Sequence, residues 1–268
     1  MPARLHHERI VRSDASPASW LVLTHGIYGT GANLRGVARK LHEARPDWGV
    51  VLVDLRLHGR STGGDPPHTV QACAEDLAAL VAELGDVGAI AGHSFGGKVA
   101  LATRPLARPR QTWILDASPS ARPGALDATG NVVADMLALM ERLPKTWARR
   151  EDFVAEIVAR GHAASLGQWL AMNLARAGDE LVLQLDLAGM RQLLESYYAT
   201  DLWGELARPD GDVELVIAER SNTLDAADRA RLAQPPPHVH VHGIDAGHWL
   251  HVEAPAAVVD LFARRLPQ

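Results

Sequence analysis

The chain of 268 residues is poor in cysteine and in aromatic residues, and it carries no strong excess of charge. Its single cysteine, Cys73, excludes a disulfide framework or a site built from several thiolates, and it is typical of a reducing compartment. A net charge of −5 without a long basic run argues against nucleic acid as a partner. The N-terminus has charges where a signal peptide would be apolar, and no apolar run reaches the roughly 18 residues of a membrane span. We therefore expect a cytoplasmic protein, and its oligomeric state is not determined by these features.

Apolar runs that predict strands alternate with segments of helical periodicity, which indicates an α/β fold with a mostly parallel, doubly wound sheet. The strand runs are largely continuous, as expected where both faces are covered. Strands are predicted at residues 20–24, 50–54, 88–92, 112–116, 213–218 and 238–242, with an antiparallel edge strand in 5–12. Helices are predicted at residues 34–44, 70–84 and 95–107, with Asn33 and Thr69 as N-caps.

Residues 120–207 break this alternation, because they show helical periodicity and few strand signals. The segment lies between two predicted core strands, so it must leave the sheet and return to it. We interpret it as a helical cap over the carboxyl ends of the strands, where ligands bind in such sheets. The predicted division is a core of residues 1–119 and 208–268 and a cap of residues 120–207.

Residues 89–98 read as an apolar strand, then G-x-S-x-G, then the start of a helix. This order is typical of a nucleophile elbow, which lifts a serine hydroxyl clear of the sheet at a helix N-terminus. Gly92 and Gly96 leave room where a Cβ would clash in such a turn. Ser94 is therefore the predicted nucleophile, and the alternative is a glycine-rich turn with an incidental serine.

A serine nucleophile needs a base and an orienting acid. In this fold type the order along the chain is serine, then acid, then histidine. His248 is the predicted base because its loop directly follows the last strand. Asp116 is the preferred acid because it ends the fourth strand at the carboxyl edge of the sheet. Asp225, after the strand at 213–218, is the alternative acid, but it also reads as a first-turn residue of a helix opened by a capping box.

The oxyanion hole is predicted to use the backbone N–H groups of Phe95 and of Ile27, which lies in a glycine-containing loop after the first strong strand. His25 in that loop is interpreted as structural. His238, His240 and His242 alternate along a strand and could bind a metal, but we interpret them as ordinary strand residues. No cofactor and no metal are implied.

Four motifs together resemble the α/β-hydrolases: His25-Gly26-x-x-Gly29, Asp54-x-Arg56-x-His58-Gly59-x-Ser61, Gly92-His93-Ser94-x-Gly96-Gly97-Lys98 and Gly247-His248-Trp249. With Asn33 and Asp116-Ala117-Ser118-Pro119, they more narrowly resemble the YbfF-type bacterial acyl esterases and their mitochondrial abhydrolase relatives.

This resemblance covers the core and is weakest in the cap. It implies that the acid follows the strand after the nucleophile helix, which favours Asp116. It also implies an accessory role for Ser221. The next residue, often aspartate in the group, is Asn222 here, and Lys98 marks the subfamily without a role that the sequence explains.

The sequence thus predicts a serine hydrolase that cleaves short- to medium-chain carboxylic esters through an acyl-enzyme on Ser94. Its partner is a small-molecule acyl ester or thioester. A thioesterase, a C–C bond hydrolase or a small-ring lyase would use the same residues. A non-catalytic receptor for a small molecule is the alternative outside the enzymes.

Overall fold

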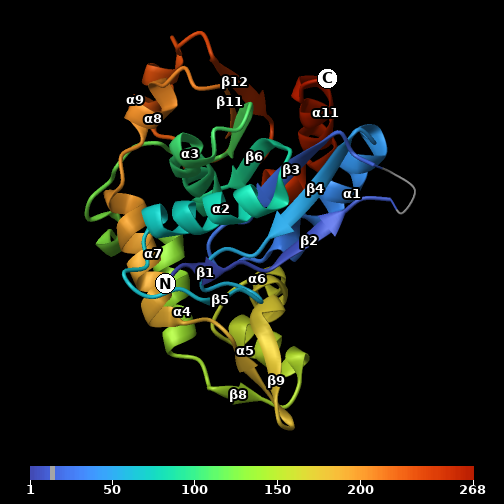
Figure 1. The fold of residues 1–268 in the computed structure, drawn as a ribbon. Coiled ribbons are helices and arrows are strands. Elements are labelled where there is room, and N and C mark those ends of the chain that lie inside the picture. Colours follow the sequence, from blue (N-terminus) through green and yellow to red (C-terminus); the bar gives the residue numbers. More distant parts are fainter. Residues whose placement is uncertain (13–15) are drawn as a thin grey trace.

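A seven-stranded sheet forms the centre of the computed structural model, which describes residues 1–12 and 16–268 (Figure 1). Neighbouring strands run parallel except at one edge, where β2 pairs antiparallel with β4. Across the sheet the order is β12 (Val239–Ile244), β11 (Asp212–Ala218), β7 (Gln111–Leu115), β6 (Val87–His93), β3 (Ser19–Thr24), β4 (Trp48–Val53) and β2 (His7–Ile10). The predicted fold class and the antiparallel edge strand are confirmed.

Helices cover both faces of this sheet (Figure 1). On one face α2 (Val70–Leu84) packs against α3 (Phe95–Ala107), and on the other α1 (Arg35–Ala44) packs against α11 (Pro255–Arg265). Each helix pair contributes to one of two buried apolar clusters, one per face. The four central strands β3, β4, β6 and β7 are almost wholly buried, which explains their continuous apolar sequence.

Helices α2 and α3 begin and end at the predicted residues, because their apolar periodicity and their boundaries are both local signals. Thr69 caps α2 as predicted, and its hydroxyl accepts a hydrogen bond from the N–H of Ala72. The prediction that Asn33 caps the next helix is wrong. A turn of 3-10 helix precedes α1, and the side chain of Asn33 instead accepts from the N–H of Thr30 at 2.6 Å.

Most of the chain between β7 and β11 lies at the lower end of Figure 1, whereas its last helix, α8 (Trp203–Ala207), lies against α3 in the upper part. A three-stranded antiparallel sheet lies among its helices, and helical periodicity did not indicate it because its strands are two to four residues long. Its elements are η2 (Ala125–Asp127), α4 (Val132–Glu141), β8 (Thr146–Trp147), α5 (Arg150–Ala159), α6 (Ala164–Leu170), η3 (Ala171–Asn173), β9 (Leu174–Ala177), β10 (Glu180–Leu183), α7 (Leu187–Ala199) and α8 (Trp203–Ala207).

Short elements complete the fold. Strand β1 (Ala3–Arg4) pairs with β5 (Thr62–Gly63), and η1 (Gly31–Leu34), α9 (Ala226–Leu232) and α10 (Leu250–Glu253) connect the larger elements. Within the described residues, no helix is both long and apolar enough to cross a membrane.

Candidate active site

Ser94 lies between β6 and α3 in a backbone conformation with φ 53° and ψ −118°. Such a positive φ is uncommon for a residue with a side chain. The turn is possible because the residues two positions before and after Ser94 are glycines: a Cβ on Gly92 would lie 2.0 Å from the carbonyl oxygen of Gly96. A Cβ on Gly96 would lie 2.5 Å from the carbonyl oxygen of His25. The spacing of glycines around Ser94 therefore follows from the space inside the turn.

The side chains of Ser94, His248 and Asp116 form a continuous line of hydrogen bonds. Oγ of Ser94 lies 3.0 Å from Nε2 of His248, and Nδ1 of His248 lies 2.7 Å from Oδ2 of Asp116. An ionised carboxylate only accepts hydrogen bonds, so Nδ1 donates to Asp116 and Nε2 is left to accept from the Ser94 hydroxyl. His248 is partly exposed whereas Asp116 is fully buried, so the imidazole has access to solvent and its carboxylate partner has none.

Asp116 is positioned by the backbone at the end of β7. Its own φ is 50°, its N–H donates to the carbonyl of Val216, and its second carboxylate oxygen accepts from the N–H of Ala218 at 3.1 Å. Both partners belong to the adjacent strand β11. The sheet edge therefore orients the carboxylate toward His248.

Asp225 lies elsewhere and has a different set of partners. It is the N-cap of α9, where its side chain accepts from the N–H of Asp228 at 2.9 Å. It also pairs with Arg122 at 3.2 Å. The hydrogen bond from the backbone N–H of Asp228 lowers the pKa of Asp225. The expectation that Asp225 is a first-turn residue is thus off by one position, because α9 begins at the next residue.

Thr223 is a site residue that sequence reasoning missed. Its hydroxyl oxygen lies 3.1 Å from Nδ1 of His248, so this nitrogen faces both Thr223 and Asp116. Ser221 donates to the Thr223 hydroxyl at 2.9 Å and is therefore one hydrogen bond removed from the imidazole. The position of this loop after β11 pointed to the region, but no local pattern distinguishes Thr223 within it.

His93, directly before Ser94, holds the backbone of His248. Its Nε2–H donates to the carbonyl oxygen of His248 at 2.7 Å, and its ring centroid lies 4.7 Å from that of His248 and 4.6 Å from that of His251. Burial, together with these two imidazoles, holds the pKa of His93 well below its usual range. Burial also lowers the pKa of His251 to about 4. Both neighbours of His248 are therefore neutral at pH 7.

The loop that carries Ile27 is shaped by two buried histidines. Nδ1–H of His25 donates to the carbonyl of Gly26, and its Nε2 accepts from the N–H of Leu55 at 3.0 Å. His58 accepts from the N–H of Tyr28 at 3.1 Å. Complete burial lowers the pKa of His25 to about 4 and that of His58 to about 3. Both ring nitrogens of His25 thus form hydrogen bonds with the backbone, as its structural interpretation predicts.

The residues that follow Ser94 and His248 in the chain pack against aromatic rings of the segment between β7 and β11. Trp249, next to His248, has its ring centroid 5.8 Å from that of Trp169 in α6. Phe95, next to Ser94, has its ring centroid 5.9 Å from that of Tyr197 in α7. The α6 and α7 segments between β7 and β11 therefore contact the residues that directly follow Ser94 and His248 in the chain.

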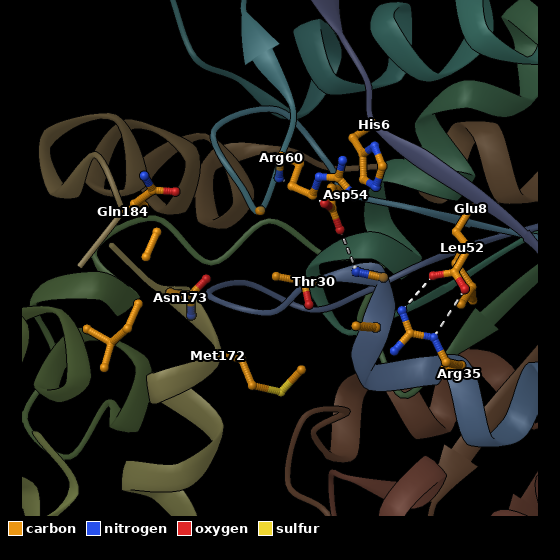
Figure 2. A pocket seen from close by; sticks show the side chains of 15 residues that line it. His6, Glu8, Thr30, Arg35, Leu52, Asp54, Arg60, Met172, Asn173 and Gln184 are labelled. Carbon is orange, nitrogen blue, oxygen red and sulfur yellow. Dashed lines mark hydrogen bonds and ion pairs between the residues drawn. The ribbon is translucent and has the colours of Figure 1, made fainter. Parts of the chain in front are cut away.

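A cavity of about 290 Å³ lies outside this site. Figure 2 shows Met172, Asn173 and Gln184 on one side and Thr30, Asp54 and Arg60 on the other. Ser94, Asp116 and His248 do not line it. Asn173 nevertheless ties the two sides together, because its amide donates to the carbonyl of Tyr28, the residue after Ile27, at 2.8 Å.

The three histidines in and before β12 each contact a different residue. His238 donates to the carbonyl of Leu206 at 3.1 Å, His242 lies 2.6 Å from Glu214, and His240 lies 3.9 Å from Asp212. Along the described ranges 1–12 and 16–268, no three histidine, cysteine or acidic side chains are grouped to hold a metal.

A parallel sheet whose strand-to-helix turn presents a serine opposite a histidine and a buried aspartate defines the class of the α/β hydrolases. The sequence places the protein in that class independently. Residues 21–261 match the model of the Alpha/beta hydrolase family, and the chain belongs to this family.

Similar proteins of known name support the same placement. The chain is 28% identical to Esterase YbfF of Escherichia coli over 262 residues, which cover 92% of each protein. It is 27% identical to the sn-1-specific diacylglycerol lipase ABHD11 of Mus musculus over 251 residues, covering 90% of this chain and 78% of the mouse protein. A solved marine microorganism esterase superposes with a TM-score of 0.81 at 20% identity, over 97% of this chain and 98% of the esterase.

Proposed function

We propose that the protein is a serine hydrolase of carboxylic esters, with Ser94 as nucleophile, His248 as base and Asp116 as the orienting acid. The observation that carries this proposal is the hydrogen-bonded line from Ser94 through His248 to Asp116, with separations of 3.0 and 2.7 Å. The names of the Escherichia coli and mouse relatives, an esterase and a lipase, support ester substrates.

In the proposed reaction, Oγ of Ser94 attacks the acyl carbonyl while Nε2 of His248 takes the hydroxyl proton. The imidazolium that forms is stabilised by the buried carboxylate of Asp116 and returns the proton to the leaving alkoxide. Water, deprotonated by His248, then attacks the acyl-enzyme, and the imidazolium returns this proton to Oγ of Ser94 as the bond to the acyl group breaks and the carboxylic acid leaves. The neutral state of His93 and His251 leaves the imidazolium free of repulsion by two adjacent cations.

The negative charge of the tetrahedral intermediate is assigned to the backbone N–H groups of Ile27 and Phe95. Phe95 is the first residue of α3, so its N–H has no acceptor within the helix. Ile27 lies in the loop held by His25 and His58, and Asn173 buttresses the same loop from the segment between β7 and β11. Two fixed donors of this kind stabilise an oxyanion without reorganisation.

We assign residues 120–207 to a cap that covers the acyl group. The pairs Trp169–Trp249 and Phe95–Tyr197 supply apolar surface from both sides of the assigned boundary. This surface suits a short- to medium-chain acyl group, in an ester or a thioester. Ser221 acts only indirectly in this assignment, because Thr223 stands between it and His248.

The decisive experiment is labelling with a fluorophosphonate probe followed by mapping of the modified peptide. Wild-type protein is expected to react at Ser94 and to hydrolyse p-nitrophenyl esters. Ser94→Ala is expected to lose both, with turnover lower by on the order of 10⁶-fold, while its thermal unfolding stays unchanged. A folded Ser94→Ala protein that retains several per cent of turnover would refute the assignment.

A further inference from the structure

Lys98 is a buried cation that the proposed reaction does not use. It lies one helical turn after Phe95 in α3, and it is 2% exposed. Its ammonium group donates to three backbone carbonyls: those of Ser120 at 2.9 Å, Tyr197 at 2.8 Å and Thr200 at 2.9 Å. An ammonium group has three donors, so this arrangement uses all of them.

The three carbonyls belong to two stretches of chain that are distant in sequence. Ser120 follows β7 closely, where the chain leaves the sheet, and Tyr197 and Thr200 lie at the end of α7, where the chain returns toward it. Carbonyls in the last turn of a helix have no partner within that helix. A cation placed there also interacts favourably with the helix dipole. Lys98 therefore caps α7 from another element and joins it to the outgoing chain.

The same contact reaches the residue beside the proposed nucleophile. The ammonium group lies 4.5 Å from the centre of the Tyr197 ring, and that ring lies 5.9 Å from the ring of Phe95. Movement of the end of α7 would therefore displace a ring that packs against Phe95. Lys98 therefore contacts the end of α7 and, through the Tyr197 ring, the residue that follows Ser94.

The charge of Lys98 persists at neutral pH. Burial lowers its pKa to about 8, and Arg122 contributes in the same direction. Within the described ranges no carboxylate forms an ion pair with Lys98, so the carbonyls are its polar partners. Loss of the ammonium would leave three carbonyls without this donor, and an apolar side chain cannot replace it.

We propose that Lys98 is a positioning residue that fastens both ends of the segment from 120 to 200 to the nucleophile helix and so fixes the Tyr197 ring against Phe95, the residue after Ser94. This inference rests on the proposed function for its catalytic consequence, but its structural consequence is independent of activity. Released ends would loosen the apolar wall formed by Tyr197. Long acyl groups, which need that wall, would lose more binding than an acetyl group.

The test compares Lys98→Met with Lys40→Met, which removes an exposed lysine of α1 as a matched control. Hydrogen–deuterium exchange is measured in the full chain at residues 118–122 and 196–202. Steady-state kinetics are measured with p-nitrophenyl acetate and p-nitrophenyl octanoate, and the rate of fluorophosphonate labelling reports on Ser94 itself. A milder variant, Lys98→Gln, keeps two donors on a shorter side chain and carries the same measurements if Lys98→Met does not fold.

The backbone amides of Lys98→Met are expected to exchange faster than those of the wild type in both stretches. KM for the octanoate ester is expected to rise about tenfold, whereas KM for the acetate ester and the rate of labelling change little. Lys98→Gln is expected to fall between it and the wild type, and Lys40→Met to match the wild type. Unchanged exchange at both stretches would overturn the proposal, and so would an equal loss with both esters. If wild-type protein neither hydrolyses the esters nor is labelled, the proposed function fails, and the exchange data still decide whether Lys98 fastens the two ends.

Discussion

The sequence offers two aspartates as candidates for the acid that orients His248, and their environments in the structure differ. Asp116 is fully buried and accepts from His248 and from the backbone of β11, whereas Asp225 caps α9 and its side chain is 52% exposed. A carboxylate that fixes an imidazole tautomer must touch its Nδ1, which Asp116 does. The capping role of Asp225 needs only an oxygen at the helix N-terminus, which asparagine also provides.

Replacement of each aspartate by asparagine separates these roles. Asp116→Asn is expected to lower kcat by roughly 10⁴-fold, because an amide that donates to Nδ1 stabilises the wrong tautomer. Asp225→Asn is the matched control and is expected to keep near wild-type turnover with a slightly lower unfolding temperature. Steady-state kinetics on the two purified variants check this, and an inactive Asp225→Asn beside an active Asp116→Asn would transfer the acid role to the later strand.

Thr223 allows a finer measurement at the same nitrogen. Thr223→Val keeps the shape of the side chain but removes the hydroxyl that lies 3.1 Å from Nδ1 of His248. We expect kcat to fall by about tenfold at most, the scale of one net hydrogen bond, with unchanged KM. Ser221→Ala, which acts one bond further away, should have a smaller effect. A larger loss in Ser221→Ala than in Thr223→Val would show that the hydroxyl of Ser221 acts directly.

At the scale of elements, the turn from β6 to α3 leaves no space for a Cβ at Gly92, whereas a Cβ added to Gly36 in α1 would point into open space. Gly92→Ala is expected to destabilise the protein by about 3 kcal/mol, because backbone atoms must shift. Gly36→Ala, the control, is expected to stabilise it by up to about 1 kcal/mol through higher helix propensity. Urea unfolding of both variants measures these changes, and a Gly92→Ala protein as stable as the wild type would contradict the tight turn.

At the scale of the whole molecule, histidines buried in the neutral form make stability depend on pH. His25 and His58 are about 1% exposed, and their pKa values lie below the ordinary 6.5, at about 4 and about 3. Between pH 6.5 and these values the unfolded chain binds protons that the folded protein does not. The contribution of these neutral histidines to the free energy of unfolding is therefore fully present above pH 6.5, and it is lost as the pH decreases.

We expect the free energy of unfolding to drop between pH 6.5 and 5, with each such histidine contributing on the order of 3 kcal/mol by pH 4. Urea titrations at closely spaced pH values measure the slope. His58→Gln, which keeps a donor and an acceptor, should give a shallower slope than the wild type. A stability that stays constant from pH 7 to pH 5 would show that these rings take up protons in the folded protein as readily as in the unfolded chain.

The sequence by itself determined the order of the main strands and helices around the central sheet. Helices α2 and α3, the strand before Ser94 and the alternation of strands with helices could be predicted because periodicity, caps and glycine spacing are properties of neighbouring residues. The wrong cap at Asn33 and the unexpected three-stranded sheet mark the limit of such signals. The 3-10 turn before α1 and the strands of the small sheet are each only two to four residues long. Local sequence preferences are weak over so few residues.

Only the tertiary structure decided which distant side chains meet. His248 lies beside Asp116 and Thr223, and Lys98 reaches carbonyls at residues 120, 197 and 200, across separations of 22 to 132 residues. No local pattern encodes these contacts, because they depend on how strands register in the sheet and on where α7 returns to it. The sequence could therefore indicate Ser94 and its candidate partners His248 and Asp116, whereas the separate contacts of Asp116 and Asp225 and the parts played by Thr223 and Lys98 required the folded chain.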